Sequence, residues 1–223
     1  MKRGLARVLV AWRTRLFMQR RYKKLVLEQV EGLPLVVLPQ VFNPRLLRSG
    51  EFLVHQLHRA DLLPPKSKVL DLGTGSGVAA VAAARGGSAV TAVDINPEAV
   101  RCTRINALLN DVECRVDARQ GDLFEPVAGE RFDVVLFNPP YYRGTPRNNL
   151  DFAWRSPDVI ERFALELGAH LMPGGHALLV LSSDGESPAF LHALAAHGLT
   201  FDTVARRDFM NEEMYVYRVS AAC

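Results

Sequence analysis

Short apolar runs alternate with segments of helical spacing along the chain from residue 68 onward. The apolar runs predict strands at 68–72, 89–94, 112–118, 132–137 and 176–182. Apolar residues that recur every three to four positions predict helices near 78–85, 97–110, 157–171 and 187–197 between them. Alternation of this kind is typical of parallel strands joined by right-handed crossovers. The pattern therefore predicts a doubly wound α/β sheet.

Two ends of the chain depart from this alternation. The runs 199–206 and 213–220 follow each other with no helix between them, so we expect a hairpin whose last strand enters a mostly parallel, seven-stranded sheet antiparallel. Near the N-terminus, residues 24–41 hold two apolar runs separated by Glu31-Gly32, which predicts a second, short hairpin. Residues 46–59 have helical spacing, with Ser49 as the expected N-cap.

The composition is that of a globular protein, since 48% of the 223 residues are hydrophobic and 23% are charged. The longest plain apolar stretch, 78–84, is far shorter than the roughly 18 residues a membrane-spanning helix needs, so we expect a soluble protein. The three cysteines, Cys102, Cys114 and Cys223, lack metal-ligand spacing. We therefore expect free thiols, no metal site and a cytoplasmic location.

Charge is unevenly distributed along the chain. Residues 1–24 carry nine basic side chains and no acidic one, whereas the remaining 199 residues carry 18 basic and 24 acidic side chains. Apolar residues at helical spacing predict an amphipathic basic helix in this segment. Three roles stay open: an arm that contacts nucleic acid or the ribosome, a helix on a membrane surface, and a helix docked on the rest of the chain, which we favour. We expect residues 1–42 to form this helix and the hairpin, ahead of a main domain at 43–223.

A glycine-rich turn follows the first of the five strands. Gly73, Gly75 and Gly77 allow the backbone to approach a ligand closely before the next helix begins. A dinucleotide fingerprint requires glycine or alanine at the position of Val78, which disfavours a nicotinamide cofactor. Asp94, about 20 residues beyond the turn, ends the second strand, where a carboxylate can accept both hydroxyls of a ribose.

Two further acids follow strands of the same predicted sheet. Asp71 directly precedes the glycines, where it can orient the turn or reach a cationic amino group. Asp122 follows the third strand and can accept a hydrogen bond from an adenine amino group. Because the carboxyl ends of parallel strands meet at one edge, the sequence predicts a single ligand site there.

The fourth strand ends in Asn138-Pro139-Pro140-Tyr141. The two prolines remove backbone donors and stiffen the turn, so we expect the Pro139 carbonyl to point outward. An NH2 group on a planar substrate can donate one hydrogen to the Asn138 side-chain oxygen and one to this carbonyl, while its face packs on Tyr141. The motif therefore favours catalysis mainly by positioning of an amide or aryl amine nitrogen, without a strong base.

Together these residues resemble class I methyltransferases that use S-adenosylmethionine, over about residues 35–220. The resemblance implies a Rossmann-like fold and assigns the reaction to Asn138, Pro139, Pro140 and Tyr141. Such motifs act on adenine N6, cytosine N4, guanine N2 or glutamine side chains. The cofactor residues that the resemblance implies are Asp71, Gly73, Thr74, Gly75, Gly77, Asp94, Ile95, Asp122, Leu123 and Asn138.

Within this class the chain is most similar to the HemK-type release-factor glutamine methyltransferases. The similarity rests on residues 43–45 and 49–54 ahead of the first strand and on 151–154 and 158–163 after the Asn-Pro-Pro-Tyr motif. The family members usually carry a larger N-terminal helical domain, where this chain has a short basic arm and a hairpin.

The resulting hypothesis is an S-adenosylmethionine-dependent N-methyltransferase that acts on a protein glutamine. Methylation of adenine N6 or guanine N2 in RNA or DNA is one alternative, with basic residues 2–24 as a phosphate or ribosome contact. A catalytically silent cofactor-binding subunit is another. In the loop after the motif, Arg143 and Arg147 either meet phosphates or acidic protein groups or are solvated, and Trp154 either stacks on a base or packs internally. We expect a protein or nucleic-acid substrate and no integral membrane association.

Overall fold

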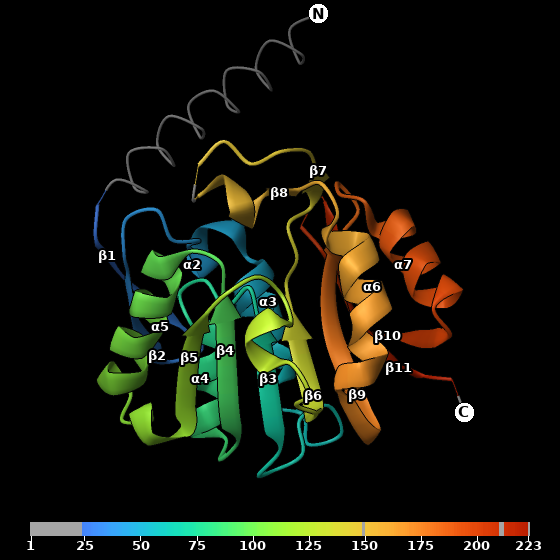
Figure 1. The fold of residues 1–223 in the computed structure, drawn as a ribbon. Helices are drawn as coiled ribbons and strands as arrows, with labels where there is room; N and C mark the ends of the chain where they lie inside the picture. The colour runs from blue at the N-terminus through green and yellow to red at the C-terminus, as the bar shows by residue number, and fades with distance from the viewer. Residues whose placement is uncertain (1–23, 149, 210–211, 223) are drawn as a thin grey trace, which may run out of the picture.

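The computed structural model describes residues 24–148, 150–209 and 212–222. A central seven-stranded sheet carries helices on both faces (Figure 1). Its strands are β3 (Lys68–Leu72), β4 (Ala89–Asp94), β5 (Val116–Gln120), β6 (Phe132–Phe137), β9 (Leu171–Ser182), β10 (Leu199–Asp208) and β11 (Glu213–Ala221). The helices are α2 (Pro44–Leu47), α3 (Ser49–Gln56), α4 (Val78–Arg85), α5 (Pro97–Leu109), α6 (Val159–His170) and α7 (Ser187–Ala196). Two short pairs, β1 (Val26–Val30) with β2 (Leu33–Val37) and β7 (Tyr142–Arg143) with β8 (Arg155–Ser156), lie outside the sheet.

The strands of the sheet follow the order β10-β11-β9-β6-β3-β4-β5. Neighbours from β9 to β5 pair in parallel, and β11 lies antiparallel to both β9 and β10. The predicted mostly parallel sheet with an antiparallel last strand is confirmed. The chain runs outward from β3 to β5 and then returns to β6 on the other side of β3. Open sheets of this topology bind ligands at the carboxyl ends of the strands beside such a reversal.

Both faces of the sheet are buried, which explains the nearly continuous apolar runs of the parallel strands. On β6, Val134 and Leu136 join a core with α3 and α4, whereas Val135 and Phe137 join a second core with α6 and α7. All four side chains are at most 2% exposed. Because alternate side chains of β6 are buried in two different cores, the strand is fixed on both faces of the sheet. The position of Asn138, which follows the strand, is therefore fixed as well.

The predicted N-terminal hairpin is present and packs on α5. Its turn residues, Glu31 and Gly32, have φ angles of 47° and 81°, as a tight two-residue hairpin turn requires. The buried Asn106 of α5 accepts from the Val36 N–H and donates to the Val36 carbonyl, both at 2.7 Å. Residues 1–23 lie outside the described residues, so the predicted basic helix and the division at residue 42 stay predictions.

Two predictions on local structure are wrong. Residues 46–59 do not form one helix, because Arg48 adopts a left-handed conformation (φ 58°) that separates α2 from α3. Ser49 is therefore not an N-cap but the first residue of α3, and Asn43 caps α2 by accepting from two backbone N–H groups.

The remaining differences concern strand ends. The strand predicted at 112–118 starts at Val116, because a short 3₁₀ turn (Glu113–Arg115) precedes it, and it runs on to Gln120. β9 starts at Leu171, five residues before the predicted start. Cys102 and Cys114 are free thiols, as expected. Within the described ranges, no helix has the length and apolarity to cross a bilayer.

Candidate active site

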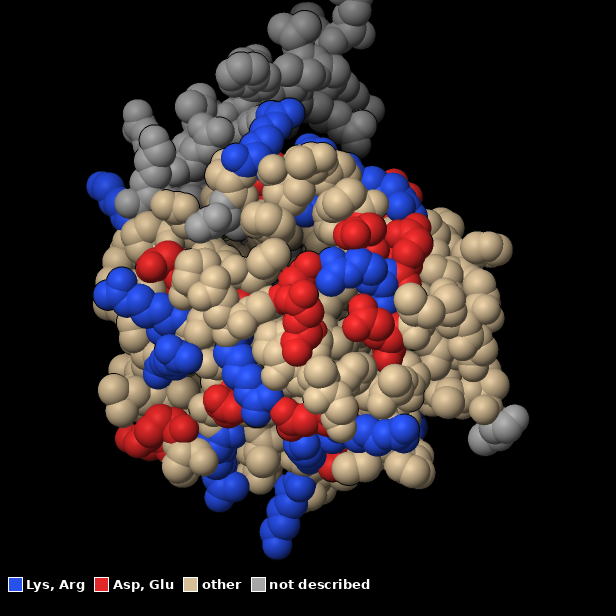
Figure 2. Space-filling view, in the orientation of Figure 1, with Lys and Arg blue, Asp and Glu red and all other residues tan. Residues whose placement is uncertain are grey.

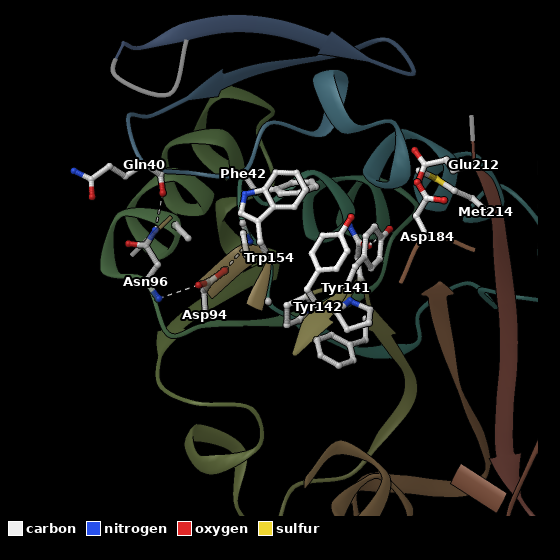
Figure 3. Close-up of a pocket in the computed structure, with 18 residues that line it drawn as sticks. Gln40, Phe42, Asp94, Asn96, Tyr141, Tyr142, Trp154, Asp184, Glu212 and Met214 are labelled. Atoms are coloured by element: carbon white, nitrogen blue, oxygen red, sulfur yellow. Dashed lines mark hydrogen bonds between the residues drawn. The ribbon is translucent and has the colours of Figure 1, made fainter. Parts of the chain in front are cut away.

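Two adjoining pockets lie along the carboxyl ends of the parallel strands. The central pocket, about 220 Å³, is lined by the glycine turn and by residues 138–142 (Figure 3). The side pocket, about 330 Å³, is lined by residues 93–95, 121–123 and 156–159, among others. Gly73, Asp94, Phe137 and Pro140 line both pockets, which therefore form one groove. The sequence predicts a ligand site at this edge of the sheet, and most of the predicted residues line the groove. Asp71, Thr74 and Gly77 line neither of the two pockets.

The glycine turn needs its glycines for two different reasons. Gly73, Gly75 and Gly77 have φ angles of 60°, 57° and 79°, which favour glycine because it has no Cβ. A Cβ at Gly77 would also lie 2.9 Å from the Thr103 Cα of α5. The turn thus exposes backbone to the central pocket and allows α4 to start close against α5.

Asp71 is buried beneath this turn. Its Oδ2 accepts a hydrogen bond from the Thr74 hydroxyl at 2.6 Å and one from the Ala80 N–H at 3.1 Å. Burial raises the pKa of Asp71 to about 7, although these two hydrogen bonds oppose the shift. Of its two predicted roles, these contacts support orientation of the turn.

Asp94 ends β4 and lines both pockets. Its Oδ2 accepts from the Gly75 N–H at 2.8 Å and its Oδ1 from the Asn96 N–H at 2.9 Å. Burial raises the pKa of Asp94 to about 6, and the two backbone donors oppose that shift. Each oxygen keeps acceptor capacity for a ligand hydroxyl, because a carboxylate oxygen has two lone pairs.

The side pocket holds the other predicted cofactor residues. Ile95 and Leu123 line it together with Asp122. The Asp122 Oδ2 forms an ion pair with Arg162 Nη1 at 2.6 Å, and the Asp122 side chain is 38% exposed. Arg162, on α6, gave no signal in the sequence as a partner for Asp122. One carboxylate oxygen of Asp122 is left for a ligand donor.

The Asn138-Pro139-Pro140-Tyr141 motif follows β6 and lines the central pocket. The Asn138 Nδ2 donates to the Ser49 hydroxyl at 3.0 Å, and the Tyr141 hydroxyl donates to the Asn138 Oδ1 at 3.0 Å. Burial raises the pKa of Tyr141, so its hydroxyl stays protonated. Among the described residues, no donor hydrogen-bonds to the Pro139 carbonyl oxygen, which leaves it as an acceptor beside Asn138.

Several side chains, most of which the sequence did not single out, form the other walls of the central pocket. Figure 3 shows Phe42 and Trp154 near Asp94, with Asp184 and Glu212 on the opposite side beyond the two tyrosines. Trp154 packs on Phe42 with ring centroids 5.9 Å apart, so it lines the pocket and packs internally at once. Gln40 and Met214 complete these walls.

The other open alternatives concern the loop after the motif and a metal. Arg143 forms an ion pair with Glu161 at 2.6 Å, so its charge is engaged by an acid of the chain itself. Across residues 24–148, 150–209 and 212–222, no group of three or more His, Cys, Asp or Glu residues is arranged to hold a metal ion.

A mostly parallel, doubly wound sheet with an antiparallel last strand, a glycine turn after its first parallel strand and an acid at the end of the second is typical of the class I S-adenosylmethionine-dependent methyltransferases. The chain belongs to the family described as methyltransferase small domain, whose model matches residues 32–207. It is therefore an S-adenosylmethionine-dependent methyltransferase. This excludes the alternative of an enzyme that uses a nicotinamide cofactor.

Two relatives and one solved structure illustrate the similarity. A Methanocaldococcus jannaschii protein, provisionally named a protein N5-glutamine methyltransferase, is 33% identical over 198 residues, which cover 84% of this chain and 95% of the relative. The ribosomal RNA small subunit methyltransferase C of Alcanivorax borkumensis is 34% identical over 146 residues, which cover 66% of this chain and 42% of that relative. The structure of the T. thermophilus 16S rRNA N2 G1207 methyltransferase with AdoMet and guanosine is 23% identical with a TM-score of 0.66, covering 89% of this chain and 50% of that one, and shows the shared fold.

Proposed function

We propose that the protein methylates the side-chain amide nitrogen of a glutamine in a protein substrate. The observation that carries this proposal is a pair of adjacent acceptors, the Asn138 Oδ1 and the Pro139 carbonyl, in a pocket that also contains the glycine turn and Asp94. A primary amide carries two N–H donors in one plane, which match two neighbouring acceptors. Tyr141 and Tyr142 supply apolar surface for the rest of a planar group.

The groove fits S-adenosylmethionine by the chemistry of its lining. Asp94 would accept the ribose hydroxyls, and Asp122 would accept the adenine amino group beside the apolar side chains of Ile95 and Leu123. The turn from Gly73 to Gly77, with Thr74, would hold the methionine part. These residues come from β3, β4 and β5 in succession, and the acceptor motif comes from the neighbouring strand β6.

The sulfonium group supplies the methyl: the nitrogen lone pair forms the carbon–nitrogen bond as the carbon–sulfur bond breaks, S-adenosylhomocysteine leaves, and one nitrogen proton passes to water. An amide lone pair is delocalised and weakly nucleophilic. By accepting both hydrogens, Asn138 and Pro139 hold the nitrogen in a fixed direction and favour its positive charge in the transition state. Most of the rate enhancement thus comes from positioning.

Three observations favour a protein over a nucleic acid as substrate. The M. jannaschii relative is matched over 95% of its length, whereas the ribosomal RNA methyltransferase has more than half its length outside the match. Asp184 and Glu212 line the central pocket and would repel phosphates. On the face drawn in Figure 2, basic and acidic side chains are interspersed. Basic side chains also pair with acids of the chain itself, as Arg143 does with Glu161.

A base in RNA is the second candidate. It is favoured by the 34% identity to the ribosomal RNA methyltransferase and by the nine basic side chains of residues 1–24, which suit phosphate contacts. A guanine or adenine amino group presents the same two N–H donors to Asn138 and Pro139. We also propose that the protein acts in the cytoplasm. If an RNA base is the substrate, basic residues 2–24 would contact RNA or the ribosome.

Transfer of labelled methyl from S-adenosylmethionine into cell extract separates the two candidates. We expect label that survives nuclease, disappears with protease, and is recovered as N5-methylglutamine after complete proteolysis. An Asn138→Ala enzyme, assayed in parallel, should give no label above background. Label that is lost to nuclease would overturn the glutamine proposal in favour of a nucleic-acid base.

A further inference from the structure

The orientation of the Asn138 side chain decides whether an NH2 group can bind to it. An asparagine amide presents either its oxygen or its nitrogen to a given side, and the two orientations differ by a half-turn. If the Asn138 nitrogen faced the substrate, its N–H groups would point at the N–H groups of the substrate amide. The two sets of hydrogen-bond donors would then repel each other. The chain must therefore hold the Asn138 side-chain amide so that its Oδ1 faces the substrate nitrogen that accepts the methyl group.

Two hydroxyl groups hold it in this orientation. The Asn138 Nδ2 donates to the Ser49 Oγ, and the Tyr141 hydroxyl donates to the Asn138 Oδ1, each at 3.0 Å. A hydrogen bond from Ser49 is also among the interactions that lower the pKa of Tyr141 against the larger effect of burial. The two hydroxyl groups thus engage both polar atoms of the Asn138 amide, Ser49 as acceptor and Tyr141 as donor.

The backbone around Ser49 is built to keep it there. Ser49 is 0% exposed and immediately follows Arg48, whose left-handed conformation turns the chain from α2 into α3. A Cβ at the next residue, Gly50, would lie 2.8 Å from the Pro44 Cβ, so only glycine allows this close corner. A hydroxyl from a segment 89 residues away is therefore held against Asn138.

We propose that Ser49 is a positioning residue for methyl transfer, which fixes the Asn138 amide with its oxygen toward the acceptor nitrogen. The inference rests on the proposed function in that the acceptor carries two N–H groups. Ser49 acts through Asn138, does not line the central pocket and does not touch the acceptor. Its loss should therefore reduce the rate of transfer and leave cofactor binding intact.

The test compares Ser49→Ala with Ser88→Ala. Ser88 is also buried, at 1% exposure, and among the described residues its hydroxyl has no hydrogen-bond partner, so the control removes a buried hydroxyl away from the site. The protein fraction of nuclease-treated cell extract serves as methyl acceptor. We expect Ser49→Ala to lower the maximal rate about 20- to 100-fold, with cofactor affinity within about twofold of the wild type. Ser88→Ala should keep the wild-type rate, and Ser49→Thr, which retains the hydroxyl, should recover most of it.

A spectroscopic measurement reports the amide itself. The side-chain amide signals of Asn138 are assigned in a ¹⁵N–¹H spectrum by their absence from Asn138→Ala, and they should shift in Ser49→Ala and not in Ser88→Ala. Wild-type turnover by Ser49→Ala, or unshifted Asn138 signals, would overturn the role of Ser49. If Asn138→Ala also keeps full activity, the proposed function itself fails, so the two failures are distinguishable.

Discussion

The two halves of the groove are held together in different ways. Around the glycine turn of the cofactor half, the contacts are short in sequence: Asp71 with Thr74 is three residues apart, and Asp94 with Gly75 is 19 residues apart. Asp122, at the far end of this half, pairs with Arg162 across 40 residues. In the acceptor half, Asn138 is held by a serine 89 residues away, and Glu212 accepts from Ser182 across 30 residues. The glycine turn and Asp94 are thus positioned by successive strand–turn–helix units, whereas the position of the Asn138 amide depends on the packing of a distant segment. Substitutions in the first half should change affinity, and those in the second should change rate.

Asn138→Ala should have the largest effect of the substitutions considered. The effect should be on kcat and not on cofactor affinity. It removes one of the two acceptors that position the nitrogen, so we expect kcat to fall at least about 10³-fold. Affinity for S-adenosylmethionine, measured by calorimetry, should stay within about twofold, because Asp94 and Asp122, the proposed contacts of the ribose and the adenine, follow other strands. A parallel loss of affinity would show that the two halves of the groove are coupled.

Asp94→Ala should produce the converse result. The ribose would lose its carboxylate acceptor, and the N–H groups of Gly75 and Asn96 would lose theirs, so we expect the Kd for S-adenosylmethionine to rise about 30- to 100-fold. The rate at saturating cofactor should fall far less. Asp202→Ala, on the exposed edge strand β10, removes the same charge and should leave the Kd unchanged. An unaltered Kd in Asp94→Ala would remove Asp94 from the cofactor site.

The pKa of Asp94 gives the cofactor half a pH dependence of known sign. Burial raises this pKa to about 6, so the carboxyl group is protonated in the free protein below pH 6 and ionised above it. Ribose hydroxyls donate hydrogen bonds to the ionised carboxylate. The affinity for S-adenosylmethionine should therefore be highest above pH 6, and the Kd should rise about tenfold for each pH unit below 6. The Kd of Asp94→Asn should be flat over the same range. A persistent slope in this variant would assign the titration to another group, such as Asp71, whose pKa is about 7.

The same contrast explains what the sequence could and could not predict. Apolar runs predict the parallel strands, and the glycine turn, Asp94 and the Asn138-Pro139-Pro140-Tyr141 motif are contiguous with them, so most of the predicted residues line one groove. The role of Ser49 does not follow from the sequence, because the break at Arg48 accompanies the close packing of Gly50 against Pro44 and has no signature in the spacing of apolar residues.

Asp184 and Glu212 escaped prediction for a related reason. Asp184 follows the end of β9 and Glu212 precedes the start of β11, and both line the central pocket because Ser182 pairs with Met214 in that register. Register between strands 30 residues apart is set by the turn and by the pattern of buried side chains together. Local motifs therefore predict the cofactor half well, and the acceptor half requires the fold.

Asp122 should make the smallest contribution, because it is partly exposed and already paired with Arg162. Its proposed role is specific to one functional group, and this permits a sharp test. S-inosylhomocysteine differs from S-adenosylhomocysteine in having an oxygen in place of the adenine amino group. The wild type should prefer the adenosyl compound about fivefold, the effect of one modest hydrogen bond. In Asp122→Ala the preference should fall to about one, whereas Asp94→Ala should weaken both compounds equally and keep the ratio. A ratio that is unchanged in Asp122→Ala would mean that the carboxylate serves Arg162 alone and that the adenine amino group is recognised elsewhere in the side pocket.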